Sequence, residues 1–123
     1  DVVPGGAVGY SGSWRASRSS RIATLAVGYA DGFARSASAA SGSPGGSVVI
    51  HGARLPVVGR VSMDLITVDV TDCPVLVRRG DVAEVIGATL PLETVGAEGR
   101  TIGYEVLTRL GRRYSRVYVG GGA

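Results

Sequence analysis

Four of the five tyrosines stand where an apolar ring and a weakly acidic hydroxyl could take part in chemistry: Tyr10, Tyr29, Tyr104 and Tyr118. Tyr10 and Tyr29 each follow a Val-Gly pair and have small neighbours, which leave a hydroxyl accessible to a ligand. Tyr118 lies in an alternating segment, and that alternation alone accounts for it. For every one of these rings, the structural alternative is a half-buried tyrosine whose hydroxyl is hydrogen-bonded.

The other reactive side chains exclude several kinds of chemistry. All thirteen basic side chains are arginines, and the net charge is +3. Without lysine there is neither a P-loop nor a Schiff base from this chain to an aldehyde cofactor. One cysteine and one histidine cannot form an internal disulfide or a structural zinc site, so we expect no metal. We interpret Cys73 as a loop or core residue and His51 as a surface residue at a strand end.

Composition narrows the class of protein further. Hydrophobic residues make up 45% of the 123 residues, and the mean hydropathy is +0.25, so one globular domain over residues 1–123 is expected. No apolar run is long enough to cross a membrane. The scattered arginines lack the interleaved aromatic residues of a nucleic-acid platform, so we expect no nucleic-acid partner. A single cysteine fits a reducing compartment, and we expect a cytoplasmic protein.

The segment that must position chemistry is Pro56–Val70, a strand-like stretch with an irregular insert. Its second half alternates between apolar and non-apolar residues, as a strand with one buried face does. The Gly59-Arg60 and Met63-Asp64 pairs interrupt the pattern where a bend could expose backbone N–H groups to a ligand. The structural alternative is a twisted strand pair with a tight connection.

The rest of the chain predicts mostly short strands. We expect an N-terminal strand that bends at Gly12, a hairpin turning at Gly52-Ala53, a surface loop at 36–47, and two short helices stopped by Gly99 and Gly111. Further strands are expected at 21–28, 81–86 and 114–119. Together these elements predict a mostly-β fold, a small β-barrel-like domain with one or two short helices near the C-terminus.

Six segments, taken in order, resemble the C-terminal domain of alanine racemase: VGYSGSW, RIATLAVGYADGFAR, LPVVGRVSMDLITVDVTD, GDVAEVIG, TIGYEVLTRLGRR and SRVYV. The resemblance covers nearly the whole chain. It implies a homodimeric pyridoxal 5′-phosphate enzyme that interconverts L- and D-alanine, with an N-terminal β/α barrel bearing the cofactor lysine. The absence of lysine agrees with this chain being the second domain only, and its N-terminus reads like a cut inside a larger protein.

The resemblance also implies roles for particular residues. Tyr10 matches the catalytic tyrosine that handles the α-proton on the L side, while the cofactor lysine of the partner subunit serves the other face. Met63 matches the residue whose backbone N–H contacts the substrate carboxylate. Tyr104 matches the tyrosine that contacts the cofactor phosphate, and Asp64 matches the acidic residue after the methionine. Five further positions match the lining of the substrate passage: Tyr29, Asp31, Arg35, Arg60 and Ile102.

The sequence departs from the family in several places. Ser62 stands where many members carry cysteine, and Gly103 where asparagine is common, which could loosen Tyr104. We expect the isolated chain neither to hold the cofactor covalently nor to racemise. One alternative is a non-catalytic β module for dimerisation or regulation in a larger, membrane-linked serine or alanine racemase. Another is a nucleic-acid-binding barrel, which salt-sensitive oligonucleotide binding would reveal.

Overall fold

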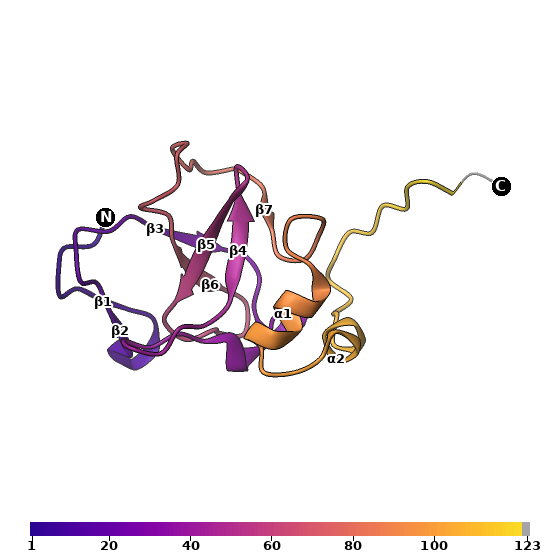
Figure 1. Cartoon of the computed structure of the whole chain (residues 1–123), viewed down its shortest axis with the longest axis horizontal. Helices are drawn as coiled ribbons and strands as arrows, with labels where there is room; N and C mark the ends of the chain where they lie inside the picture. The colour runs from indigo at the N-terminus through magenta and orange to yellow at the C-terminus, as the bar shows by residue number, and fades with distance from the viewer. Residues whose placement is uncertain (122–123) are drawn as a thin grey trace.

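A computed structural model describes residues 1–121. Its centre is a five-stranded antiparallel sheet in the order β3-β6-β5-β4-β7, which curls into a half-barrel (Figure 1). The strands are β3 (Ile22–Leu25), β4 (Ser47–Ile50), β5 (Ala53–Val58), β6 (Ile66–Asp69) and β7 (Ala83–Glu84). The prediction of a mostly-β, barrel-like domain with short helices near the C-terminus is confirmed.

Two antiparallel hairpins, β4–β5 and β5–β6, form the centre of the sheet. The β4–β5 turn places His51 at φ 51° and Gly52 at φ 75°, a left-handed pair that a two-residue hairpin loop requires. Strands β5 and β6 pair through Val57↔Val68 and Val58↔Thr67. The seven residues between them, 59–65, leave the sheet and form the predicted irregular insert.

The core lies mainly on one face of the sheet and consists mostly of β-branched residues, which fit a pleated surface. The alternation that was read in Pro56–Val70 is the burial pattern of β6, where Ile66 and Val68 are buried and Thr67 and Asp69 are partly exposed. The largest fully buried side chains are Val48, Ile50, Val57, Ile66, Val68 and Leu90.

A small two-stranded sheet lies beside the main one at the N-terminal end (Figure 1). Its strands β1 (Ala7–Val8) and β2 (Trp14–Arg15) are joined by the 3-10 turn η1 (Tyr10–Gly12). Ser11 and Gly12 both have positive φ, so the predicted bend at Gly12 is a complete reversal of direction. Tyr10 is therefore carried at the tip of a hairpin.

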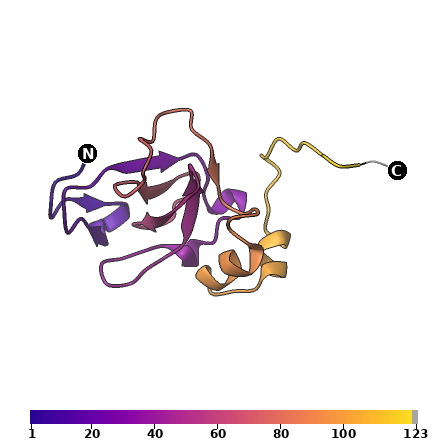
Figure 2. The same ribbon diagram turned by 45° about the horizontal axis from the view of Figure 1, so that its top comes forward.

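Helices α1 (Leu92–Glu98) and α2 (Gly103–Thr108) pack against each other at the other end of the sheet, as both views show (Figures 1 and 2). Two further 3-10 turns, η2 (Tyr29–Asp31) and η3 (Arg35–Ala37), connect β3 to β4. No helix within residues 1–121 has the length and apolar character needed to cross a membrane.

Three sequence predictions about secondary structure need correction. The segment Tyr114–Val119 is not a strand. Tyr114 is half-buried and donates its hydroxyl to Asp31 O, while the residues after it leave the domain as an extended tail in which Tyr118 is 89% exposed rather than half-buried (Figure 1). The predicted strand at 81–86 is reduced to β7. The segment 36–47 is not purely a surface loop, because Ala37 and Ala39 are buried and Ala39 N–H donates to Gly59 O at 2.9 Å.

Candidate functional site

The insert at 59–65 is the platform of the candidate site, and the Tyr10 hairpin lies directly against it. A Cβ atom at Gly9 would lie 3.0 Å from the backbone N of Arg60 and 3.1 Å from the Cα of Gly59. Gly9 and Gly59 both adopt positive φ. Two glycines with this freedom let the backbones touch, and the contact brings Tyr10 beside Arg60.

The η2 turn lies against the same insert. Tyr29 N–H donates to Ser62 O and Ala30 N–H donates to Met63 O, both at 3.0 Å. A Cβ atom at Gly28 would lie 2.4 Å from each of those two carbonyl oxygens, so only glycine allows this approach. The Val-Gly-Tyr motif therefore places Tyr29 next to Met63 through backbone contact.

The C-terminal end of α2 closes the arrangement from the other side. A Cβ atom at Gly32 would lie 2.4 Å from the carbonyl oxygen of Arg109, and Gly111 N–H donates to Asp31 O at 3.2 Å. These contacts fix the helix that carries Tyr104 against the η2 turn.

Arg113 joins three of these segments with one side chain. Its Nε and Nη2 donate to the two carboxylate oxygens of Asp31 at 2.8 and 2.9 Å, and its Nη1 donates to Asp64 Oδ1 at 2.8 Å. Asp31 also accepts a bond from Gly28 N–H at 3.1 Å. The Arg113 guanidinium is the main cause that holds the pKa of Asp31 below its ordinary value, in opposition to desolvation.

Sequence reasoning missed this role of Arg113. In the sequence Arg113 is one of several scattered arginines, and 82 residues separate it from Asp31. The sole local signal was that Asp31 and Asp64 are acidic residues in irregular segments. Acidic residues in turns are common, so that signal did not indicate a shared partner.

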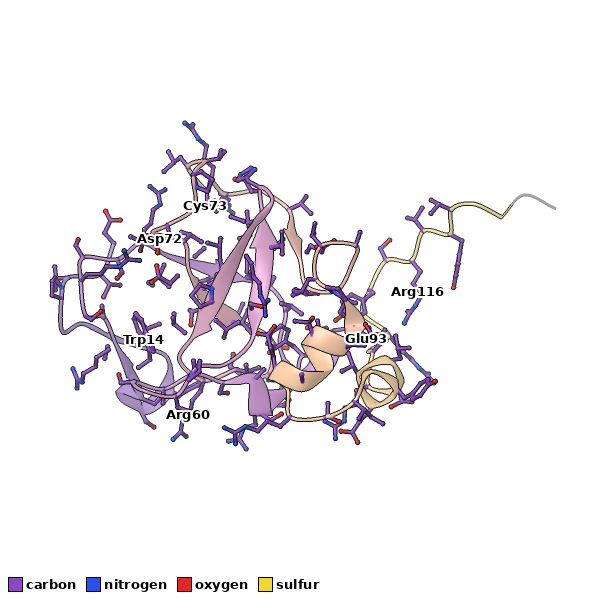
Figure 3. The ribbon with its side chains drawn as sticks, viewed as in Figure 1. Trp14, Arg60, Asp72, Cys73, Glu93 and Arg116 are labelled. Atoms are coloured by element: carbon purple, nitrogen blue, oxygen red, sulfur yellow. The ribbon has the colours of Figure 1, made fainter. Side chains whose placement is uncertain are left out.

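The predicted site residues form a chain of shallow surface hollows. Tyr10 and Arg60 line a groove of about 370 Å³. Arg60 and Arg35 line the next hollow, and Arg35 shares a third with Tyr29. Figure 3 shows Arg60 at the edge of the molecule, away from the ends of β4 and β5 that form the hairpin turn. Four of the predicted residues thus lie along one continuous surface.

Three of the other predicted residues occupy different surroundings. Ile102 and Tyr104, at the start of α2, are 64% and 79% exposed and line none of these hollows. The side chain of Asp31 is only 8% exposed and is bound to Arg113. Its placement on the substrate passage stays a prediction, whereas its contact with Arg113 is a feature of the structure.

At Met63 the backbone N–H, rather than the side chain, is the predicted binding group. Its carbonyl accepts a bond from Ala30, and the neighbouring Ser62 N–H and hydroxyl both donate to Leu65 O. Within residues 1–121, the Met63 N–H itself donates to no acceptor of the chain. A free backbone donor on an exposed, well-fixed loop can bind a carboxylate oxygen.

The chain offers limited means of holding a cofactor or metal. It has no lysine for a covalent bond to an aldehyde. Tyr104 is exposed. Within the described range 1–121, no three His, Cys, Asp or Glu side chains are grouped in a way that could hold a metal ion. The chain therefore lacks the side chain that an aldehyde cofactor needs for a covalent bond.

Solved structures place this fold among known proteins. The chain superposes on alanine racemase from Bartonella henselae, solved with covalently bound pyridoxal phosphate, with a TM-score of 0.88 and 44% identity over 96% of this chain and 32% of that one. Alanine racemase from Bacillus anthracis, solved with bound L-Ala-P, matches with a TM-score of 0.83 and 31% identity over 99% of this chain and 30% of that one. The fold of this chain therefore matches about a third of each of these solved chains.

The family model for the alanine racemase C-terminal domain matches residues 1–118, and the chain belongs to that family. Among curated relatives, alanine racemase from Rhizobium meliloti is 50% identical over 98% of this chain and 34% of its own length. The corresponding protein from Methylobacterium is 48% identical over 97% of this chain and 32% of its own length. The chain therefore spans about a third of the relatives it matches.

Proposed function

We propose that this chain is the C-terminal domain of a longer, homodimeric, pyridoxal phosphate-dependent alanine racemase. In this proposal it supplies Tyr10 and the Met63 N–H to an active site completed by the barrel of the other subunit. The observation that carries the proposal is the convergence of the Tyr10 hairpin and the free Met63 N–H on one exposed insert. Membership of the alanine racemase family supports the assignment of a racemase role to these two groups.

Racemisation requires a proton to leave one face of the α-carbon and another to arrive at the opposite face, so two groups must handle protons. In the proposal, the Tyr10 hydroxyl serves the L face. Tyr10 is 68% exposed, which suits a residue that acts in a site shared with another domain. The lysine that would serve the other face must come from outside this chain.

The Met63 N–H would bind the substrate carboxylate and so orient the α-hydrogen toward Tyr10 without adding a titrating group. Its donor is not committed to another acceptor within residues 1–121. Arg60 and Arg35 along the neighbouring hollows would attract the carboxylate of an arriving amino acid. Together with Tyr29, Asp31 and Ile102, they are the residues that we propose for the substrate passage.

Bound pyridoxal phosphate would supply the electron sink for the charge left on the α-carbon. This chain would contribute the Tyr104 hydroxyl toward the phosphate and no covalent link. Gly103 departs from the family pattern just before Tyr104. The side chain of Leu92 of α1 occupies the space that a side chain at position 103 would need, and it would lie 2.9 Å from an added Cβ atom.

The proposal is tested by Tyr10→Phe in the full-length protein. Loss of the α-proton from L-alanine and from D-alanine is followed separately in ²H₂O. We expect exchange from L-alanine to fall by about 10²- to 10⁴-fold, the usual contribution of a positioned proton-transfer group. Exchange from D-alanine should fall much less.

Tyr118→Phe is the matched control, because it removes a tyrosine hydroxyl from the exposed tail and should leave both exchanges unchanged. An equal loss in both directions for Tyr10→Phe would contradict a one-sided role. Sustained racemisation by the isolated lysine-free chain, with added pyridoxal phosphate, would contradict the domain assignment.

A further inference from the structure

We propose that Arg113 is a positioning residue for the substrate carboxylate, because it fixes the direction of the Met63 N–H through Asp31 and Asp64. The inference rests on the proposed function, since it names what holds the carboxylate contact in place. It adds Arg113 and Asp64 to the residues on which binding of the amino acid depends.

The first step is the geometry of one peptide plane. Ser62 C=O and Met63 N–H belong to the same planar peptide unit and point in opposite directions when that unit is trans. No cis peptide bonds occur within residues 1–121. Ser62 O accepts from Tyr29 N–H at 3.0 Å, so the Met63 N–H must point away from the η2 turn. Any displacement of η2 relative to the insert would therefore turn the Met63 donor.

The second step is what holds η2 against the insert. Arg113 binds Asp31 of η2 in a two-bond fork and binds Asp64, the residue after Met63, with its remaining terminal nitrogen. One planar guanidinium thus fixes the separation between η2 and the insert, the two segments that set the direction of the Ser62–Met63 peptide plane. The fork geometry is fixed, so a change in either segment would break at least one of the three bonds.

The third step separates positioning from simple stabilisation. The Asp31 end of the network is buried, whereas Arg113 and Asp64 are 53% and 55% exposed where they meet. An exposed ion pair contributes little to folding stability. Carboxylate binding is more sensitive, because it depends on a charge-assisted hydrogen bond whose N–H must point at the carboxylate oxygen. Removal of the Asp64 arm should therefore alter substrate binding more than stability.

The experiment uses Asp64→Ala in the full-length protein. The KM for L-alanine is measured, together with the Kd of propionate, a carboxylate that lacks the amino group and does not react. We expect both constants to rise roughly tenfold, which is within what one charge-assisted hydrogen bond contributes, with kcat within about threefold of wild type. The urea midpoint should be unchanged.

Asp72→Ala is the matched control. It removes another exposed carboxylate bound by an arginine fork, that of Arg18, at 3.0 and 2.7 Å. This variant should change neither the KM for L-alanine nor the Kd of propionate. Arg113→Lys provides a second variant: a single ammonium cannot reproduce the fork and the third bond, so it should raise both constants at least as much as Asp64→Ala.

The outcomes distinguish the two proposals. Unchanged KM and propionate affinity in Asp64→Ala, in a wild-type background that racemises alanine, would overturn the role of Arg113 and leave the proposed function intact. A fall in kcat alone would also overturn it. A full-length wild-type protein that neither racemises alanine nor binds propionate would overturn the proposed function and this inference together.

Discussion

At the scale of single residues, Asp31 shows how a buried charge is accommodated in a small domain. Its carboxylate receives two bonds from Arg113 and one from Gly28 N–H, and its backbone carbonyl accepts from Tyr114 Oη at 2.7 Å. Desolvation raises the pKa of Tyr114. A buried carboxylate is tolerated because its charge and hydrogen-bonding capacity are satisfied.

The lowered pKa of Asp31 predicts how stability depends on pH. The carboxylate binds protons more weakly in the folded state than in the unfolded state, whose pKa is about 3.9. Its stabilising contribution is complete above that pKa and is lost as pH falls through the folded pKa. We expect Asp31→Asn to lower the free energy of unfolding at pH 7 and to flatten the fall of that free energy below about pH 5.

Urea unfolding of the chain, followed by Trp14 fluorescence at several pH values, checks this prediction. The Asp72→Asn variant is the comparison. Arg18 likewise lowers the pKa of Asp72, but the Asp72 side chain is 74% exposed and solvent screens the pair. If the free energy of unfolding of Asp31→Asn depended on pH as steeply as that of the wild type, the proposed contribution of the Asp31 carboxylate would be contradicted.

At the scale of elements, glycines decide how closely the insert, the Tyr10 hairpin and η2 approach. Gly28 has an extended backbone, φ −153° and ψ −164°, that any residue can adopt. It is needed for space alone, since the carbonyl oxygens of Ser62 and Met63 occupy the place of a side chain. The contact between η2 and the insert thus depends on the absence of a methyl group at position 28.

Gly28→Ala tests this contact directly. The added methyl group should push η2 from the insert and reduce the free energy of unfolding by about 1–3 kcal/mol, the usual cost of overpacking. The measurement is a urea unfolding curve. Gly121→Ala, at a position where an added Cβ atom meets nothing within 4 Å, should change stability by less than about 0.5 kcal/mol. Equal stabilities of the two variants would show that the loops can move apart freely.

At the scale of the whole molecule, the core and the candidate site are separate. Buried side chains of the core cover one face of the main sheet, whereas the candidate residues lie on the surface made by the insert and the turns beside it. Large apolar side chains are exposed there, among them Tyr10, Met63 and Leu65. Such a surface is typical of one that another domain covers.

This separation predicts which residues determine stability. Ile66→Ala should lower the free energy of unfolding by about 2–5 kcal/mol, because Ile66 is 1% exposed at the centre of the core. Val117→Ala, in the exposed tail, should change it by less than about 0.5 kcal/mol. Calorimetric or urea unfolding of both variants provides the comparison. A large loss in Val117→Ala would show that the tail belongs to the folded core.

Much of the fold could be predicted from the sequence because its signals are local. The β4–β5 hairpin was readable from Gly52, and the end of α1 from the helix-stopping Gly99. Alternation marked β6, where one face is buried, yet it misled at Tyr114–Val119. An alternating segment becomes a strand only if another strand pairs with it, and none within residues 1–121 does.

The sequence by itself determined the family, the mostly-β class and the identity of the candidate residues, because residue types and their order carry those properties. The tertiary structure decided which of these residues meet. Tyr10, Tyr29 and Met63 come together through backbone contacts at Gly9 and Gly28, and these contacts depend on space between distant segments. The Arg113 network spans 82 residues to Asp31 and 49 to Asp64. Only folding places one guanidinium between two carboxylates so far apart in the chain.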